Sequence, residues 1–292
     1  MRSDFCAFIL SHGRPDKVKT LETLLRCGYT GDIRIIVDDE DKTLEEYKSL
    51  HGDMVYVFNK AEAAEYTDAG DNFQRRDTVL YARNASFGIA KELGYKYFIQ
   101  LDDDYNRFNY MFRADRHWDG GSLILNLDAV FEAMLEFYEG TNLLSLCMCQ
   151  KGDYIGGSES RYAGSIMMAR KAMNSFICSV DRPFKFMGRM NDDVNTYTRL
   201  GHDGHLMMSF NYVALNQPPT QGTKGGLTEM YLDFGTYAKS FYTIMYAPAC
   251  AIVTGMGASI YRLHHMIRWD ATWPKIMREK HRKSISKSDD TA

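Results

Sequence analysis

Three consecutive carboxylates close a short apolar segment in the first half of the chain. Residues 95–101 are mostly apolar, and Asp102, Asp103 and Asp104 follow them directly. Side chains two residues apart on a strand share a face, so Asp102 and Asp104 point the same way and Asp103 points the other way. Two such carboxylates can hold a divalent cation through hard oxygen ligands and leave open positions for phosphate oxygens. The pattern therefore indicates a nucleoside-diphosphate site, and the alternative is an acidic turn exposed to solvent.

The segments before these acids predict the elements that must position them. Apolar runs of strand length alternate with helical segments in the order 5–10, 16–26, 33–37, 44–50 and 54–58. A further helix at about 77–93 leads into the strand before Asp102, and residues 59–78 between them are predicted to form a loop. This order predicts an α/β fold with a doubly wound, mostly parallel central sheet. In such a sheet the ligand crevice lies at the C-terminal ends of the strands.

Candidate ligand contacts follow the ends of these strands. The turn after the first strand holds four of them: Ser11, His12, Gly13 and Arg14. This turn can face a base or a phosphate, and Arg14 can pair with a diphosphate. Asp38 ends the second strand, where it can accept a hydrogen bond from uracil or from a ribose hydroxyl. Arg83 lies one turn into its helix, where it can hold a phosphate or orient an aspartate. Each position is also compatible with an ordinary turn or helix.

The second half of the chain contributes acids and histidines. Asp192 and Asp193 follow Gly188 at a predicted helix N-terminus, with Asn191 as a candidate cap. Acids in a first helical turn are also favoured by the helix dipole. His264 and His265 follow a predicted strand and point to opposite faces if the chain is extended, so at most one of them can serve a site. Between these groups, the loop 217–226 holds Lys224 among glycines. This composition is compatible with a phosphate-binding loop and with a surface turn.

Composition indicates an ordinary globular protein. The chain has 292 residues, of which 45% are hydrophobic and 25% are charged, and no apolar run approaches the length of a membrane span. We therefore predict a cytoplasmic protein without a membrane partner. The six cysteines lie mostly in apolar segments and are predicted to be reduced core residues. Residues 275–292 carry six basic and three acidic side chains although the whole chain has a net charge of −3, which favours a polyanionic partner or a solvated tail.

The motifs resemble those of a known family. The helix with Arg83, the glycine turn and the strand ending in Asp102–Asp104 resemble the nucleotide-sugar half of GT-A glycosyltransferases. Six motifs together resemble the TET-associated, fringe-like DNA glycosyltransferases of bacteriophages: SHGRP at 11–15, ARN at 82–84, LDDDY at 101–105, NDDV at 191–194, GGLTE at 225–229 and GTYAKSFY at 235–242. The resemblance runs over residues 4–270. It implies a single GT-A domain of residues 1–292, with a nucleotide-sugar half at about 1–104, an acceptor half at about 105–270 and a basic tail at 271–292.

The resemblance also implies roles for individual residues. Asp104, then Asp102, would bind Mn²⁺ or Mg²⁺, with His264 as a further ligand in preference to His265. Asp103 would contact the sugar or the ribose. Asp192 or Asp193 would be the general base that deprotonates an acceptor hydroxyl, with Asp192 preferred.

The implied reaction moves a sugar from a UDP-sugar to the hydroxyl of a hydroxymethylated pyrimidine in DNA, with 5-hydroxymethylcytosine preferred. Arabinose and glucose remain open as the sugar, and the reaction is expected to invert the anomeric configuration. A flipped base could stack on an aromatic segment, whose members are Tyr105, Phe108, Tyr110, Phe112 and Trp118, beside the phosphate-binding candidates Arg107, Arg113 and Arg116. The alternatives are a GT-A enzyme acting on a glycan, lipid or protein, and a sugar-nucleotide-binding module without catalysis.

Overall fold

The computed structural model describes residues 1–113, 115, 117–150, 154, 157–159, 171–172, 174–217, 228–235, 237–256 and 262–272. Two predictions lie outside these residues. They are the glycine loop beyond Gln217 with Lys224 and the basic tail from residue 273 onward.

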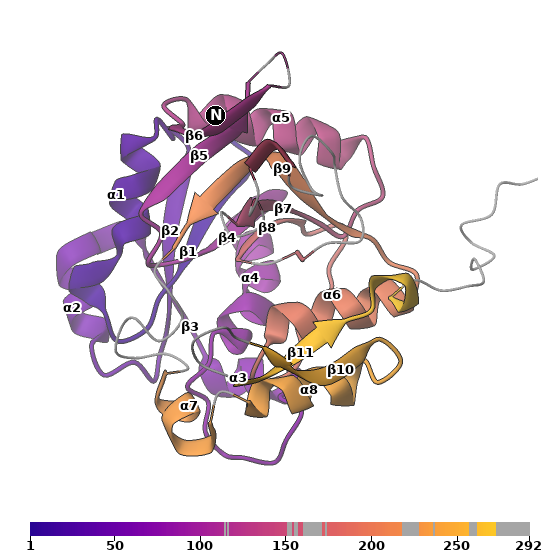
Figure 1. The fold of residues 1–292 in the computed structure, drawn as a ribbon. Coiled ribbons are helices and arrows are strands. Elements are labelled where there is room, and N and C mark those ends of the chain that lie inside the picture. Colours follow the sequence, from indigo (N-terminus) through magenta and orange to yellow (C-terminus); the bar gives the residue numbers. More distant parts are fainter. Residues whose placement is uncertain are drawn as a thin grey trace, which may run out of the picture.

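A nine-stranded sheet forms the centre of the molecule, in the order β3-β2-β1-β4-β8-β7-β9-β5-β6 (Figure 1). Its first four members pair in parallel: β1 (Phe5–Leu10), β2 (Asp32–Asp38), β3 (Val55–Phe58) and β4 (Tyr97–Asp102). The other half contains β5 (Arg107–Phe112), β6 (Trp118–Leu123), β7 (Ser145–Gln150), β8 (Ser175–Ser179) and β9 (Met207–Asn216). In this sheet β5 and β8 run against the common direction, because both pair antiparallel with their neighbours. The arrangement confirms the predicted α/β class with a mostly parallel sheet, as expected of the GT-A fold.

Helices cover both faces of the sheet because the buried strands are apolar on both sides. Along β1, Phe5, Ala7 and Ile9 pack on one face with α1 (Lys19–Arg26), α2 (Leu44–His51) and α5 (Leu127–Glu139). The alternate residues Cys6 and Phe8 pack on the other face with α3 (Lys60–Glu65), α4 (Leu80–Glu92) and α6 (Asp192–His202). The two halves predicted from the sequence therefore share one continuous sheet and one pair of cores.

A smaller layer lies outside α6 on the second face (Figure 1). It consists of α7 (Thr228–Phe234), α8 (Ala238–Tyr246) and the antiparallel hairpin of β10 (Ala251–Met256) and β11 (Arg262–Ile267). Helix α8 contacts α6 and both hairpin strands. Short 3₁₀ turns occupy Pro15–Lys17, Gly52–Met54, Gly157–Glu159 and Trp269–Ala271. No helix in the described part of the chain is both long and apolar enough to cross a membrane.

The predicted loop at 59–78 is partly wrong. Residues 60–65 of it form α3, and Asn59 caps this helix because its side chain accepts a hydrogen bond from Glu62 N. The rest of the segment is held by Arg189, a fully buried side chain that binds Asp71 through Nε and Nη2 at 2.8 and 2.9 Å. The six cysteines are buried and free, as predicted.

Candidate active site

The acidic turn after β4 lies at the C-terminal edge of the sheet, where Asp102 pairs with Leu10 of β1. Thr20 of α1 fixes its backbone. The Thr20 hydroxyl donates to the carbonyl of Asp102 at 2.5 Å and accepts from Tyr105 N at 2.9 Å, while Thr20 N donates to the carbonyl of Asp103. A turn held by three such bonds presents its carboxylates in a fixed direction, as a ligand-binding edge requires.

Asp103 corrects one prediction. Its side chain is 1% exposed, accepts a hydrogen bond from Ser11 Oγ at 2.6 Å and pairs with Arg14 Nη2 at 2.9 Å. A carboxylate that is so enclosed cannot contact a sugar, so Asp103 instead joins β4 to the turn after β1. Burial raises the pKa of Asp103 to about 7. Ser11 is buried with it, and Arg14 keeps part of its guanidinium exposed.

Asp104 and Asp102 form the partly exposed side of the turn. Burial and the charge of Asp102 raise the pKa of Asp104 to about 6. A cation relieves this arrangement, since it replaces the repulsion between the two carboxylates with attraction. The donor set therefore fits a hard divalent ion. Among the described residues no three His, Cys, Asp or Glu side chains form a metal-binding group, so the ligand roles of Asp104, Asp102 and His264 stay predictions.

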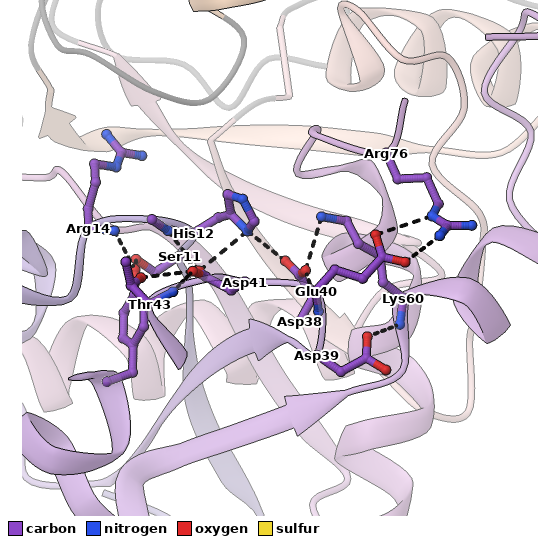
Figure 2. A network of polar contacts seen from close by, with 12 residues as sticks. Ser11, His12, Arg14, Asp38, Asp39, Glu40, Asp41, Thr43, Lys60 and Arg76 are labelled. Atoms are coloured by element: carbon purple, nitrogen blue, oxygen red, sulfur yellow. Dashed lines mark hydrogen bonds and ion pairs between the residues drawn. The ribbon is translucent and has the colours of Figure 1, made fainter. Parts of the chain in front are cut away.

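The ends of β1 and β2 carry a polar network (Figure 2). His12 Nδ1 lies 2.7 Å from Asp38 Oδ2 and 3.4 Å from Asp41 Oδ2, and Gly13 N donates to the same Asp41 oxygen. The pairing with Asp38 raises the pKa of His12, and the pKa of Asp38 is lowered by His12 and Lys60 against the effect of burial. The predicted contacts His12, Gly13 and Asp38 are thus brought together at the crevice edge.

Sequence reasoning missed Lys60 in this network. Lys60 Nζ lies 3.1 Å from Asp38 Oδ1, and both side chains are almost fully buried. Lys60 is the first residue of α3, and its ammonium lies at the end of β2. The weak periodicity of residues 59–78 did not predict this contact. A lysine that follows an Asn cap directly after a strand was the available signal.

Arg83 lies between the two acidic groups of the site. Its Nη2 is 3.0 Å from Asp102 Oδ1, and its Nε is 2.8 Å from Asp192 Oδ2. The guanidinium also packs on the rings of Phe176 and Phe186, at 5.0 and 5.6 Å. With 3% of its surface exposed, Arg83 has little room for a phosphate, and of its two predicted roles the structure shows the contact with aspartates.

Asp192 and Asp193 open α6, as predicted, and both are buried. The preceding Gly188 has a φ of +85°, and a Cβ there would lie 2.2 Å from the Asn195 amide, so the turn requires glycine. Asn191 does not cap the helix. It adopts a left-handed conformation, and its amide donates to the carbonyl of Lys239 and the hydroxyl of Thr243 in α8. Burial and the charge of Asp192 raise the pKa of Asp193 to about 7.

The two late histidines lie against each other, with ring centroids 4.3 Å apart, rather than on opposite faces as predicted. Burial and the neighbouring positive charges lower the pKa of His265 to about 3, so it is neutral. His265 Nδ1 lies 3.2 Å from the Asn191 amide, which places this histidine next to the start of α6.

The aromatic segment predicted to stack a base is largely core. Tyr105 and Phe108 are fully buried, so they cannot receive a base. Tyr110, Phe112 and Arg113 line a cavity of about 460 Å³ together with side chains of α5 and β9. Arg107 is exposed, and Arg116 lies outside the described residues.

A family model for TET-associated glycosyltransferases matches residues 5–226, which is most of the chain. The chain belongs to the TET-associated glycosyltransferase family. The family assignment makes the protein a glycosyltransferase, and the motifs that carried the resemblance up to residue 194 lie inside the matched range. No curated protein matches the chain.

Solved structures similar to this TET-associated glycosyltransferase share little sequence. Glucosyl-3-phosphoglycerate synthase from Mycobacterium tuberculosis, with Mg²⁺ and UDP, has a TM-score of 0.46 and 10% identity over 90% of this chain and 87% of that one. The same enzyme with Mn²⁺, UDP and phosphoglyceric acid has a TM-score of 0.45 and 10% identity, covering 90% and 86% of the two chains. S. aureus TarS with UDP-GlcNAc has a TM-score of 0.41 and 10% identity, covering 82% and 66%.

Proposed function

We propose that this protein transfers a sugar from a UDP-sugar to the hydroxyl of 5-hydroxymethylcytosine in DNA, with Mn²⁺ or Mg²⁺ as its cofactor. The observation that carries the proposal is the pair Asp102 and Asp104 at the C-terminal edge of a doubly wound sheet, in a chain of the TET-associated glycosyltransferase family. Two of the similar proteins were crystallised with UDP and with UDP-GlcNAc, which agrees with a UDP-sugar as the donor.

The donor would lie along the ends of β1, β2 and β4. His12 offers a partly exposed ring to a nucleoside, and the buried carboxylates of Asp38 and Asp41 hold that ring in place (Figure 2). Asp104 and Asp102 would hold the metal, which neutralises the charge that develops on the departing diphosphate. Arg14 keeps guanidinium surface beside this group for a phosphate oxygen.

The acceptor side is the start of α6. A carboxylate there can take the proton of the acceptor hydroxyl while its oxygen attacks the sugar carbon opposite the departing UDP. Asp192 and Asp193 are both candidates for this general base, and the transfer would invert the anomeric configuration. The DNA acceptor is proposed from the family name and from the sequence motifs, whose resemblance to bacteriophage enzymes implies a reaction on phage DNA in the host cytoplasm.

One experiment separates this function from its alternatives. The protein is incubated with Mn²⁺, a UDP-sugar (UDP-glucose or UDP-arabinose) and duplex DNA containing cytosine, 5-hydroxymethylcytosine or 5-hydroxymethyluracil. Mass spectrometry of the released nucleosides identifies the product. We expect a sugar adduct on hydroxymethylcytosine and none on cytosine. The incubation is repeated with glycan, lipid and protein acceptors in place of DNA, and transfer to these acceptors alone would contradict the DNA proposal. UDP binding without turnover of any acceptor would indicate a non-catalytic module.

A further inference from the structure

Helix α8 turns its large apolar side chains away from the protein. Tyr237, which directly precedes the helix, shares one face with Phe241 and Met245 because the three are four residues apart. They are 49%, 52% and 52% exposed, whereas Ser240 and Thr243 on the other side of the helix are fully buried. A surface helix normally places its apolar side inward. The reversed pattern of α8 therefore indicates that its outer face is a binding surface.

A second pair of exposed rings extends this face. Phe73, in the segment before α4, stacks on Phe234 of α7 with ring centroids 5.3 Å apart, and the two side chains are 52% and 37% exposed. The Tyr237 ring contacts Phe241 with centroids 6.2 Å apart, and it lies over Gly235, where a Cβ would be 2.5 Å from the ring. Tyr237 thus connects α7 to the outer face of α8. The aromatic patch is defined as Phe73, Phe234, Tyr237, Phe241 and Met245.

Contacts on its inner side hold the aromatic patch against the candidate active site. Asp71 pairs with Arg189 and accepts a hydrogen bond from the Tyr242 hydroxyl, which ties the segment of Phe73 to α8. The amide of Asn191, in the turn that leads into α6, donates to two oxygens of α8 at 3.2 and 3.1 Å. The polar side of α8 faces inward because it makes these contacts, and the patch is fixed relative to the start of α6.

The aromatic patch also borders the donor crevice. Three residues after Phe73, Arg76 pairs with Glu40, and Glu40 N donates to Asp38 Oδ1 at 3.2 Å (Figure 2). Asp38 ends β2 at the crevice edge. The patch therefore lies between the ends of the donor-side strands and the outer layer of the molecule, where a large acceptor must approach.

The chemistry of the aromatic patch fits unstacked bases of DNA. Aromatic side chains stack on any base, because every base has a π face, and apolar side chains at a DNA surface insert between base steps. The arginines beside the patch are paired, Arg75 with Asp233 at 2.6 Å and Arg76 with Glu40. The patch thus adds rings rather than net charge. Basic groups for the phosphates follow this layer in the sequence, where residues 275–292 hold six of them.

Building on the proposed DNA acceptor, we infer that the aromatic patch is the surface that receives the bases around the modified nucleotide. A base inside a duplex must leave the stack before a crevice can take its hydroxymethyl group. Its neighbours then lose a stacking partner, and the rings of the patch replace that partner at the rim of the crevice. The patch acts in acceptor binding, while sugar transfer takes place in the crevice.

Binding of the full chain to DNA, without donor or metal, tests the aromatic patch. The probe is a fluorescein-labelled single strand of mixed sequence, followed by fluorescence anisotropy. Phe241→Ser should weaken binding by roughly 5- to 150-fold, the range for one stacked base. The loss should be the same at low and high salt, because stacking releases no counterions. Leu125→Ser, at a 69% exposed apolar side chain outside the patch, is the matched control and should bind as the wild type does. Equal affinities of the two variants would overturn the inference.

Sedimentation equilibrium tests the other occupant of an exposed apolar face, which is a second copy of the chain. We expect the wild type and Phe241→Ser to sediment as monomers. A wild-type dimer that becomes a monomer in Phe241→Ser would overturn the inference, because the patch would then join two copies. Thermal unfolding of Phe241→Ser should match the wild type, since the side chain is exposed.

Activity measurements separate this inference from the proposed function. Slow transfer of the sugar to water, measured as UDP release with Mn²⁺, should be unchanged in Phe241→Ser, whereas KM for hydroxymethylated DNA should rise. If the wild type modifies no DNA but its binding to the single strand depends on Phe241, the acceptor proposal fails and the aromatic patch stands. If hydroxymethylated DNA is modified with the same KM by the wild type and Phe241→Ser, the proposed function stands and the patch is refuted.

Discussion

At the residue scale, consecutive acids in this protein have opposite fates because of the geometry of their elements. Asp103 points into the protein and pairs with Ser11 and Arg14, while Asp104 remains partly exposed. Both residues lie in the turn after β4, which ends at Asp102, so the bend of this turn rather than strand alternation directs them apart. The side chain that looked equally suited to bind a ligand is therefore a connection between β4 and the turn after β1.

The different contacts of Asp104 and Asp103 predict different effects when each is substituted. Asp104→Ala should lose most turnover and the response to Mn²⁺ while keeping its unfolding temperature, because the site loses a metal ligand but no buried contact. Asp103→Ala is the matched control. It should lower the unfolding temperature, since it leaves the Arg14 charge without its partner. Thermal unfolding and a Mn²⁺ titration of activity check both variants, and full activity of Asp104→Ala in the presence of a chelator would exclude its metal role.

The His12 and Asp38 pair predicts a pH dependence of stability. The pKa of His12 is raised, so its stabilising effect is complete below its ordinary pKa of about 6.5 and is lost as pH rises through the folded value. The lowered pKa of Asp38 gives the opposite limit, with stability lost as pH falls below about 4. Raising the pH from 6 to 8.5 should therefore lower the unfolding temperature less in His12→Gln than in the wild type.

His117→Gln is the control for this measurement, because His117 is an exposed histidine paired with Asp115 outside the crevice. Its pH dependence should follow the wild type. Asp103 and Asp193 have pKa values raised to about 7, so their effect on stability falls between about pH 4 and pH 7 and overlaps the start of this range. Only the difference between variants therefore reports on His12. An identical slope in wild type and His12→Gln would contradict the ion pair.

At the element scale, the sequence predicted what local patterns determine. Apolar runs located β1 to β4, and the acids that follow them lie at the predicted edge. The sequence did not predict contacts between segments that are distant along the chain. Arg83 meets Asp192 and Arg189 meets Asp71 across more than a hundred residues, and no spacing rule links such partners. Tyr105 and Phe108 looked like a stacking surface because a strand pattern does not tell which face is covered.

The contact of Arg189 with Asp71 predicts how the segment before α4 is held. Asp71→Asn leaves a buried guanidinium without its charge partner, which should lower the free energy of unfolding by roughly 3 kcal/mol. Arg189 also binds the carbonyl oxygens of Phe73 and Arg75, so proteolysis should cut this segment faster in the variant. Asp203→Asn is the control, because the exposed Arg199 and Asp203 pair contributes at most about 1 kcal/mol. Equal urea midpoints for the two variants would show that Arg189 does not hold the segment.

At the scale of the whole molecule, one sheet and its core position the residues proposed for both substrates. The β1 to β4 half ends in the proposed donor residues, and α6 on the same core begins with the acids proposed for the acceptor side. The buried Arg83 contacts both Asp102 and Asp192 and so connects the two groups directly. A rigid frame of this kind positions a small donor well, but a long polymer needs contacts beyond the crevice.

The basic tail is suited to such contacts by its composition. Residues 275–292 hold six basic side chains against three acidic ones, and lysine and arginine side chains bind phosphates without reading sequence. Each phosphate contact contributes about 0.9 to the slope of log K against log salt for duplex DNA. Deleting 275–292 should therefore weaken binding equally on all sequences and flatten the slope by up to about 5. A full-length variant with the six basic residues changed to Gln should behave like the deletion, whereas an unchanged affinity and slope in both would exclude the tail from DNA binding.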